Sequence, residues 1–231
     1  LAPQALVLPS RSTATDAVTR TAQNFTHGVI AAIEHDCDLV VLGDHDDTWH
    51  PGRVAHQAEL LQADPTLAMV ASDGVLAYDG SPGAVTRLRE AFPIDPAFGS
   101  WSAADQLRYA LGHSIATGGA SAIRASVLAP VLVPPLGWLH DRWWSLAACA
   151  MGAMAVDDTA VIDYRVRAGQ QVGLERGRQS ASGAARAWAT LRGAGGHLAR
   201  ARTLREGLLP VARDAQVRQA LALAAIARAG A

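Results

Sequence analysis

The sequence predicts an α/β fold in which a parallel or mixed sheet is flanked by helices and followed by a helical C-terminal extension. Short apolar segments alternate with longer segments whose apolar residues recur at helical spacing, which is typical of such a sheet. Hydrophobic residues make up 50% of the 231 positions, which is ample for a packed core. From residue 176 onward the chain is mainly Ala, Arg and Leu, which indicates two or three amphipathic helices. We therefore expect a sheet-containing domain over residues 1–175 and a helical extension over residues 176–231.

The N-terminal part of the chain alternates strand and helix. A short strand is expected at residues 5–8. Asp16 can cap a helix over residues 16–34, in which apolar side chains recur at helical spacing. The apolar run at residues 38–43 then predicts a buried strand that leads directly into an acidic motif.

A second helix and a further strand follow this motif. Proline at position 51 suits the first turn of a helix over residues 51–62, and residues 64–65 are expected to end it. The side chains of this helix expected to face the core are Val54, Leu60 and Leu61. Residues 67–71 predict another buried strand, which the polar residues 72–74 are expected to stop.

The next segment, residues 78–101, loses periodicity and is expected to form a surface excursion. Order is expected to return at residues 103–111 and again at 121–128. Residues 138–151 predict a strong helix that carries Trp143 and Trp144, both expected to belong to the core.

Composition excludes several classes of protein. The formal net charge is −1 and the sequence has no dense basic stripe, which argues against nucleic acid as a partner. No segment approaches the roughly 20 uninterrupted apolar residues of a transmembrane helix. Cys37 and Cys149 both lie in apolar surroundings, so we expect small buried thiols in a reducing compartment and no disulfide.

Three carboxylates, those of Asp44, Asp46 and Asp47, lie within four residues directly after the buried strand at 38–43. Such a cluster is self-repelling unless a cation or a shared proton relieves it, so we expect Mn²⁺ or Mg²⁺ here. One alternative is that these residues cap the following helix, although capping requires only one of them. Another is a zinc-like site that also uses His45 and His50.

Five segments, in this order along the chain, resemble the family 2 glycosyltransferases of the GT-A fold, and within them the rhamnosyltransferase-like branch. The resemblance covers about residues 5–173. The segments are Asn24-Phe25, residues 43–51, Thr117-Gly118-Gly119, His140-Asp141-Arg142-Trp143, and Asp163-Tyr164-Arg165 followed by Gln171-Val172-Gly173.

The resemblance implies a GT-A-like catalytic domain that transfers a sugar from a nucleoside diphosphate to an acceptor hydroxyl, with inversion at the anomeric carbon. Asp44, Asp46 and Asp47 would hold the divalent metal against the departing diphosphate. Asp46 would be the direct ligand, Asp44 would contact the ribose or a metal-bound water, and Asp47 would support the cluster from behind.

Asp141 is the residue that the resemblance assigns as catalytic base for the acceptor hydroxyl. Taken alone, Asp141 could equally cap its helix, and His140 would only orient it. Thr117, Gly118 and Gly119 would line the donor and acceptor pocket, since glycine lets a substrate approach the backbone closely. The same three residues could also form a plain turn.

The chain departs from the family pattern at two places. Arg167 stands where relatives usually have a histidine, so Arg165 and Arg167 could contact the diphosphate directly, or they could be a solvated pair. The strand-helix units with which relatives grip the nucleoside base would precede Leu1, so we expect an N-terminally incomplete catalytic domain or another segment that completes the nucleotide pocket.

The expected partners are thus a nucleoside diphosphate sugar and a glycan or glycolipid acceptor of the cell envelope. The expected location is the cytoplasm, at the inner face of the plasma membrane if the C-terminal helices touch a bilayer. Those helices could instead dimerise or pack on the domain, and packing is the default. Two other functions stay open: a catalytically inactive binding module of the same fold, and a metal-dependent phosphohydrolase.

Overall fold

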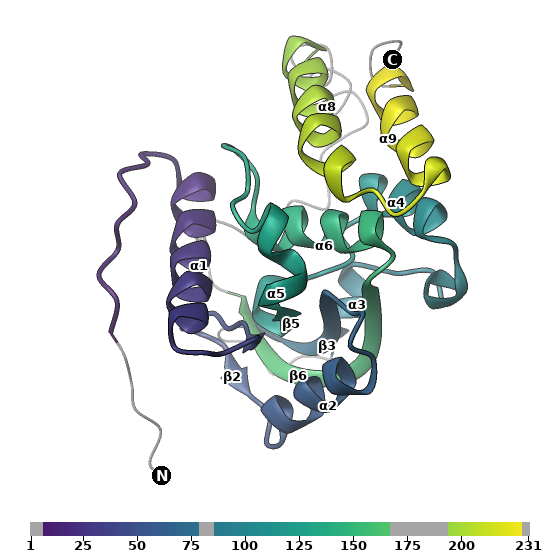
Figure 1. Ribbon diagram of the computed structural model, residues 1–231. Coiled ribbons are helices and arrows are strands. Elements are labelled where there is room, and N and C mark those ends of the chain that lie inside the picture. The colour runs from purple at the N-terminus through teal and green to yellow at the C-terminus, as the bar shows by residue number, and fades with distance from the viewer. Residues whose placement is uncertain (1–6, 79–85, 167–193, 228–231) are drawn as a thin grey trace.

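The computed structural model describes residues 7–78, 86–166 and 194–227. Its centre is a six-stranded mixed sheet in the order β1-β5-β3-β6-β2, with β4 paired to β3 (Figure 1). The strands are β1 (Leu39–Val41), β2 (Thr48–Trp49), β3 (Met69–Tyr78), β4 (Thr86–Arg87), β5 (Ser121–Arg124) and β6 (Met154–Val166). Only β3 and β6 run parallel, and the other pairs are antiparallel. The predicted α/β class with a mixed sheet is therefore confirmed.

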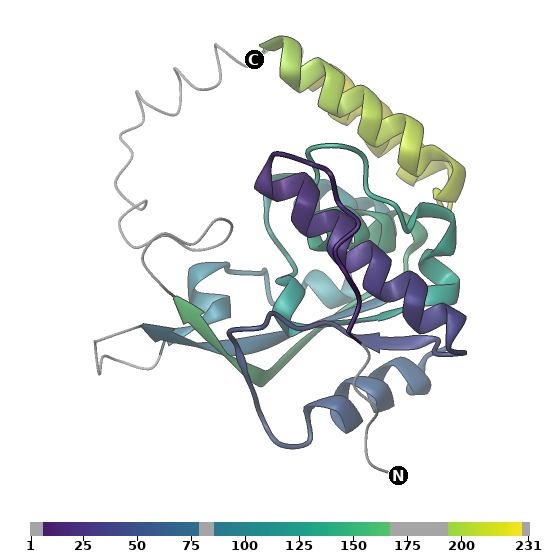
Figure 2. The ribbon, with the colours of Figure 1, turned by 90° about the vertical axis from the view of Figure 1, so that its left-hand side faces the viewer.

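The helices form layers on both sides of this sheet (Figure 2). α2 (Arg53–Ala63) covers one face, where it contacts β1, β3 and β5. α1 (Ala17–Glu34) and α6 (His140–Met151) lie on the other face, and α4 (Ala103–Gly112) packs against α6. The short helices are α3 (Leu88–Ala91) and α5 (Ala125–Leu128).

The main core lies between the sheet and α6, because nine of the twelve residues of that helix are buried. Trp143 and Trp144 are 2% and 0% exposed, as predicted, and their indole N–H groups donate to the carbonyl oxygens of Val131 and Leu132. A buried indole needs such an acceptor, so these bonds fix both rings and the N-terminal half of α6. A smaller core around Leu61 fills the space between the sheet and α2.

The predicted helix at residues 16–34 is confirmed as α1. Its start is fixed by Asp16, whose side chain accepts a hydrogen bond from the Thr19 amide at 2.8 Å. The expected strand at residues 5–8 is not seen in its described part, since Val7 and Leu8 are exposed and lie outside any strand.

The prediction that β3 stops at residues 72–74 is wrong, because the strand continues to Tyr78. Ser72 and Asp73 are buried inside it. The Asp73 carboxylate accepts from the Arg87 guanidinium at 2.7 Å and from the Arg89 backbone amide at 3.1 Å. These distant partners satisfy a polar residue that would otherwise favour a turn.

The orientation predicted for α2 is only partly right. Leu61 is buried, but Val54 is 53% exposed, and the helix starts at Arg53, one residue after Gly52 with its positive φ of 79°. The side chains that face the sheet beside Leu61 are Arg53 and Gln57, each four residues from the next. The polar side chains of this face bond to Leu42, Ser72 and Ala120.

The C-terminal helices are α8 (Ala194–Leu208) and α9 (Ala215–Ala227), which pack on each other, with α9 also against α4. Leu208, Val217 and Leu221 are fully buried, so the described part of the extension packs on the domain as the default predicted. None of the helices in the described residues is long and apolar enough to cross a membrane.

The two cysteines differ in exposure, whereas both were predicted to be buried. Cys149 lies in the core, where burial raises the pKa of its thiol. Cys37, just after the C-terminal end of α1, is exposed.

Candidate functional site

Three segments that are far apart in the sequence meet at two adjacent glycines. Gly118–Ala120 form a short 3-10 turn before β5, and β5 pairs with β1, whose continuation carries the acidic motif. A Cβ atom placed on Gly119 would lie 2.6 Å from Asp47 Oδ2 and 3.0 Å from Asp44 Oδ2. The backbone amide of Gly118 donates to Asp141 Oδ2 at 3.0 Å. The turn thus lies against the acidic motif on one side and against the start of α6 on the other.

Both glycines are required by this close approach. A Cβ atom on Gly118 would lie 2.6 Å from His140 Nε2, and one on Gly119 would overlap the Asp47 carboxylate. Any larger residue would push the acidic motif or α6 away from the turn. The Thr117 carbonyl oxygen accepts from the amide of Ala120 and from the hydroxyl of Ser121, which closes the turn.

The ionised forms of Asp44 and Asp47 are destabilised by their surroundings. Burial raises the pKa of Asp47 to about 6, and the charges of Asp44 and Asp46 add to this, although a hydrogen bond from the Arg165 amide at 3.1 Å opposes it. Burial is also the largest cause that raises the pKa of Asp44, and the charges of Asp141 and Asp46 raise it further. Asp47 Oδ2 is buried and has no hydrogen-bond partner. Such a group favours a proton or a cation.

Arg53 is the main residue of this region that the sequence analysis missed. It is 2% exposed, and its guanidinium donates from Nη2 to the Leu42 carbonyl at 2.5 Å and lies 4.2 Å from the centre of the Trp49 ring. Burial lowers the pKa of Arg53 to about 10, and the charges of Asp47 and Asp44 oppose this change. Arg53 therefore stays cationic at neutral pH and partly offsets the two carboxylates.

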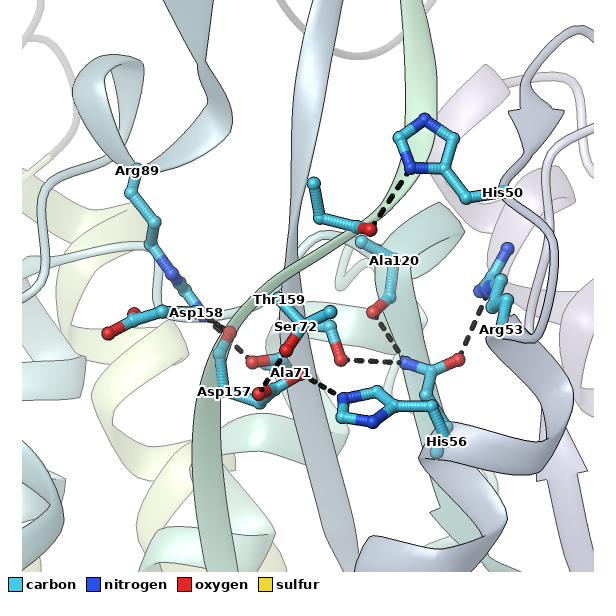
Figure 3. A network of polar contacts seen from close by, with 12 residues as sticks. His50, Arg53, His56, Ala71, Ser72, Arg89, Ala120, Asp157, Asp158 and Thr159 are labelled. Atoms are coloured by element: carbon cyan, nitrogen blue, oxygen red, sulfur yellow. Dashed lines mark hydrogen bonds and ion pairs between the residues drawn. The ribbon is translucent and has the colours of Figure 1, made fainter.

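Gln57 connects Arg53 to the glycine turn. Its Oε1 accepts from Arg53 Nε at 3.0 Å, and its Nε2 donates to the Ala120 carbonyl at 2.9 Å and to Ser72 Oγ at 3.0 Å. Figure 3 labels Arg53, Ala120 and Ser72, the three partners of Gln57, beside the His56–Asp157 pair. Because Gln57 is fully buried and uses both ends of its amide, it fixes the arginine relative to the turn.

Asp141 and His140, both in the first turn of α6, have different surroundings. The Asp141 carboxylate accepts from the amides of Gly118 and Arg142, while Leu139 occupies the N-cap position. Asp141 is therefore not the N-cap of its helix, which was one alternative. His140 is 4% exposed, stacks on Phe25 with ring centres 3.8 Å apart, and has no hydrogen-bond partner at either ring nitrogen.

Burial lowers the pKa of His140, and the charge of Asp141 only partly opposes this. A neutral imidazole packed between aromatic rings can hold the position of α6 but is poorly placed to accept a proton from a substrate.

The remaining predicted residues lie at the edge of this region or beyond it. His50 contacts Asp163 at 2.8 Å and the Ala160 carbonyl at 3.0 Å, so both of its ring nitrogens have partners away from the acidic motif. His45 is exposed. Arg165 contacts the motif through its backbone amide. Arg167 and residues 171–173 lie outside the described residues.

The same geometry bears on the binding of a divalent cation. Across residues 7–78, 86–166 and 194–227 there is no group of three or more His, Cys, Asp or Glu side chains arranged to hold a metal ion. Asp44 Oδ2 and Asp47 Oδ2 nevertheless face the same point above Gly119, and the second of them lacks a partner. The residues therefore fit a cation that takes two protein carboxylates and completes its oxygen shell from a phosphate ligand and water.

Compared with models of known protein families and with curated proteins, the sequence matches none of them.

Proposed function

We propose that this protein is an inverting glycosyltransferase that moves a sugar from a nucleoside diphosphate to an acceptor hydroxyl. The observation that supports it most is the meeting of Asp44, Asp47 and Asp141 at the adjacent glycines 118 and 119. Such a transfer needs a cation beside the leaving diphosphate and a base beside the attacking hydroxyl, on two sides of one sugar. Carboxylates on both sides of one turn supply groups of the kind that this requirement calls for.

Asp44, Asp46 and Asp47 would hold Mn²⁺ or Mg²⁺, which when bound offsets the negative charge that the diphosphate gains as it leaves. Asp44 would in addition reach the ribose. Arg53 supplies a fixed positive charge behind the cluster, and Gln57 keeps that charge in register with the turn. Arg165 lies next to Asp47 through its backbone, so its side chain starts beside the proposed diphosphate position.

Asp141 would act as the base. Its carboxylate takes the proton of the acceptor hydroxyl as the new glycosidic bond forms and the bond to the diphosphate oxygen breaks, so attack occurs opposite to the leaving group and inverts the anomeric carbon. The bonds from the amides of Gly118 and Arg142 hold the carboxylate in place. Thr117, Gly118 and Gly119 would line the donor and acceptor pocket, as the resemblance implies.

The finer assignment rests on the sequence motifs. We propose a GT-A fold of the family 2 type, in its rhamnosyltransferase-like branch, acting on a cell-envelope glycan or glycolipid at the cytoplasmic face of the membrane. The curled mixed sheet with helices on both faces is compatible with that fold.

The test is a transfer assay with a panel of nucleoside diphosphate sugars and Mn²⁺, in which release of the nucleoside diphosphate is followed with and without candidate acceptors. Acceptor-dependent release that is lost in Asp46→Asn supports the proposal. Equal release without any acceptor identifies a phosphohydrolase. Calorimetry with the nucleoside diphosphates and Mn²⁺ provides the second measurement, and absence of binding to all of them would leave the non-catalytic module as the explanation.

A further inference from the structure

The loop over residues 132–139 displays apolar side chains that no other described segment covers. It joins the turn Ala129–Val131 to α6 and rises beside α1 in Figure 1. Val133 is 69% exposed and Leu136 is 81% exposed, the larger fraction being among the highest of the apolar residues described. Single exposed apolar residues are common, but two on one short loop with a consecutive pair of prolines between them form a local apolar tip.

The base of this loop is fixed. The Gly137 amide donates to Thr19 Oγ1 at 3.3 Å, and its carbonyl accepts from Arg200 Nη2 at 3.0 Å. The Trp138 ring lies edge-on to Trp143, with ring centres 5.7 Å apart, and so connects the loop to the core. The apolar tip is therefore held outward by α1, α6 and α8, and its exposure is a property of the folded protein.

Aromatic and cationic groups lie just behind the tip. The Arg200 guanidinium is 5.3 Å from the centre of the Trp138 ring, and Arg200 is exposed. A cavity of about 310 Å³ opens at the same place, lined by Trp138, Leu139, Leu204, Arg142 and Arg200 among others. An aliphatic tip, a tryptophan at its base and an exposed arginine beside that tryptophan are residue types suited to hydrocarbon, interface and charged headgroups.

We propose that residues 132–139 form an insertion loop that docks this protein on the surface of an anionic lipid bilayer. Leu136 and Val133 enter the acyl boundary, Trp138 lies at headgroup depth, and Arg200 faces the anionic headgroups. The positive charge of the exposed Arg200 beside the apolar tip favours an anionic bilayer over a second protein surface. This docking goes beyond the proposed sugar transfer and does not depend on it.

If both proposals hold, they are connected through α6. The loop leads directly into the first turn of that helix, which carries Asp141. A protein docked by this loop would therefore present its base close to the headgroup plane, where the hydroxyl of a lipid-anchored acceptor lies.

The experiment is sedimentation of the full chain with vesicles of phosphatidylcholine alone or with added phosphatidylglycerol, without nucleotide, sugar or metal. We expect binding to the anionic vesicles and a fall of about tenfold or more in the partition coefficient for Leu136→Glu, since a leucine leaves the hydrocarbon boundary and a negative charge enters. Val54→Glu is the matched control, because Val54 is also exposed but lies on α2 across the sheet, and it should bind like the unmodified chain.

Three results would overturn the docking. They are absence of binding to anionic vesicles, equal loss of binding in both variants, and light scattering that shows the unmodified chain as a dimer that Leu136→Glu converts to a monomer. The last result would assign the loop to contact between two copies. Thermal melts of both variants check folding, which should be unchanged because both side chains are exposed. Vesicle binding with no sugar transfer would reject the proposed function and leave the docking intact.

Discussion

Replacement of Asp47 by Asn should stabilise the protein at neutral pH in the absence of divalent metal. Asn has nearly the shape of Asp, and its oxygen can still accept from the Arg165 amide, so the change removes the charge and little else. The amide nitrogen would take the place of Oδ2, which lies beside Gly119 as Asp44 Oδ2 does, and it adds donors where two carboxylates now meet. A destabilised carboxylate is thereby exchanged for a neutral group.

The size of the effect follows from the pKa of Asp47, which burial raises from 3.8 to about 6. Such a change corresponds to at most about 3 kcal/mol, and we expect about 1 to 2 kcal/mol because water still reaches part of the side chain. The sign follows from the raised value. Below pH 3.8 the Asp47 carboxyl is protonated in both the folded and the unfolded protein, so Asn has no advantage there. As the pH rises through about 6 the folded protein also loses this proton, so the advantage of Asn is largest above pH 6.

The assay is urea unfolding of both proteins in chelator at several pH values between about 3.5 and 8, with Asp105→Asn as the control. Asp105 is exposed, and hydrogen bonds from the Ser102 hydroxyl and from Arg108 lower the pKa of its carboxyl, so its replacement should not stabilise at any pH. A difference between Asp47→Asn and the unmodified protein that is zero or does not change with pH would refute the reasoning. Added Mn²⁺ should stabilise the unmodified protein more than the variant.

Three further changes test the site. Gly119→Ala should destabilise the fold by about 1 to 3 kcal/mol and abolish nucleotide binding, because its Cβ meets two carboxylates. The control is Gly28→Ala inside α1, whose Cβ meets nothing within 4 Å and which should stabilise the fold by about 0.5 to 1 kcal/mol. Equal melting temperatures of the two variants would contradict this contrast. Asp141→Asn should lower kcat by about 100-fold to 10,000-fold while calorimetry shows unchanged donor binding, and full activity would exclude Asp141 as the base. Arg53→Met should cost about 3 kcal/mol in urea unfolding, since a cation beside buried carboxylates is removed; the exposed neighbour Val54→Met serves as its control and should have little effect.

The sequence predicted those parts of the fold that depend on local chemistry. α1 begins after the Asp16 cap, and α6 contains the two buried tryptophans, because capping and helical spacing are properties of neighbouring residues. β3 was predicted too short, since Asp73 finds its partners Arg87 and Arg89 only in the folded chain. Long-range polar pairing of this kind leaves no pattern in a single sequence.

The candidate site shows the same division. The acidic motif stands out because three carboxylates are consecutive or nearly so, and the motifs around Gly119 and Asp141 were found through resemblance. Apolar spacing does not predict Arg53 and Gln57 as buried, because the face of α2 toward the sheet is partly polar. Arg53, Gln57 and Leu61 recur every four residues, and this spacing was the available signal.

The contrast between the two cysteines gives the protein a single natural attachment point. Cys149 is enclosed and its thiol resists deprotonation, whereas Cys37 is open to solvent after the end of α1. A maleimide dye or spin label should therefore react at one position without any engineering. Such a reporter would sit on the side of the molecule where α1 meets β1, ready for fluorescence or electron paramagnetic resonance experiments on the unaltered polypeptide.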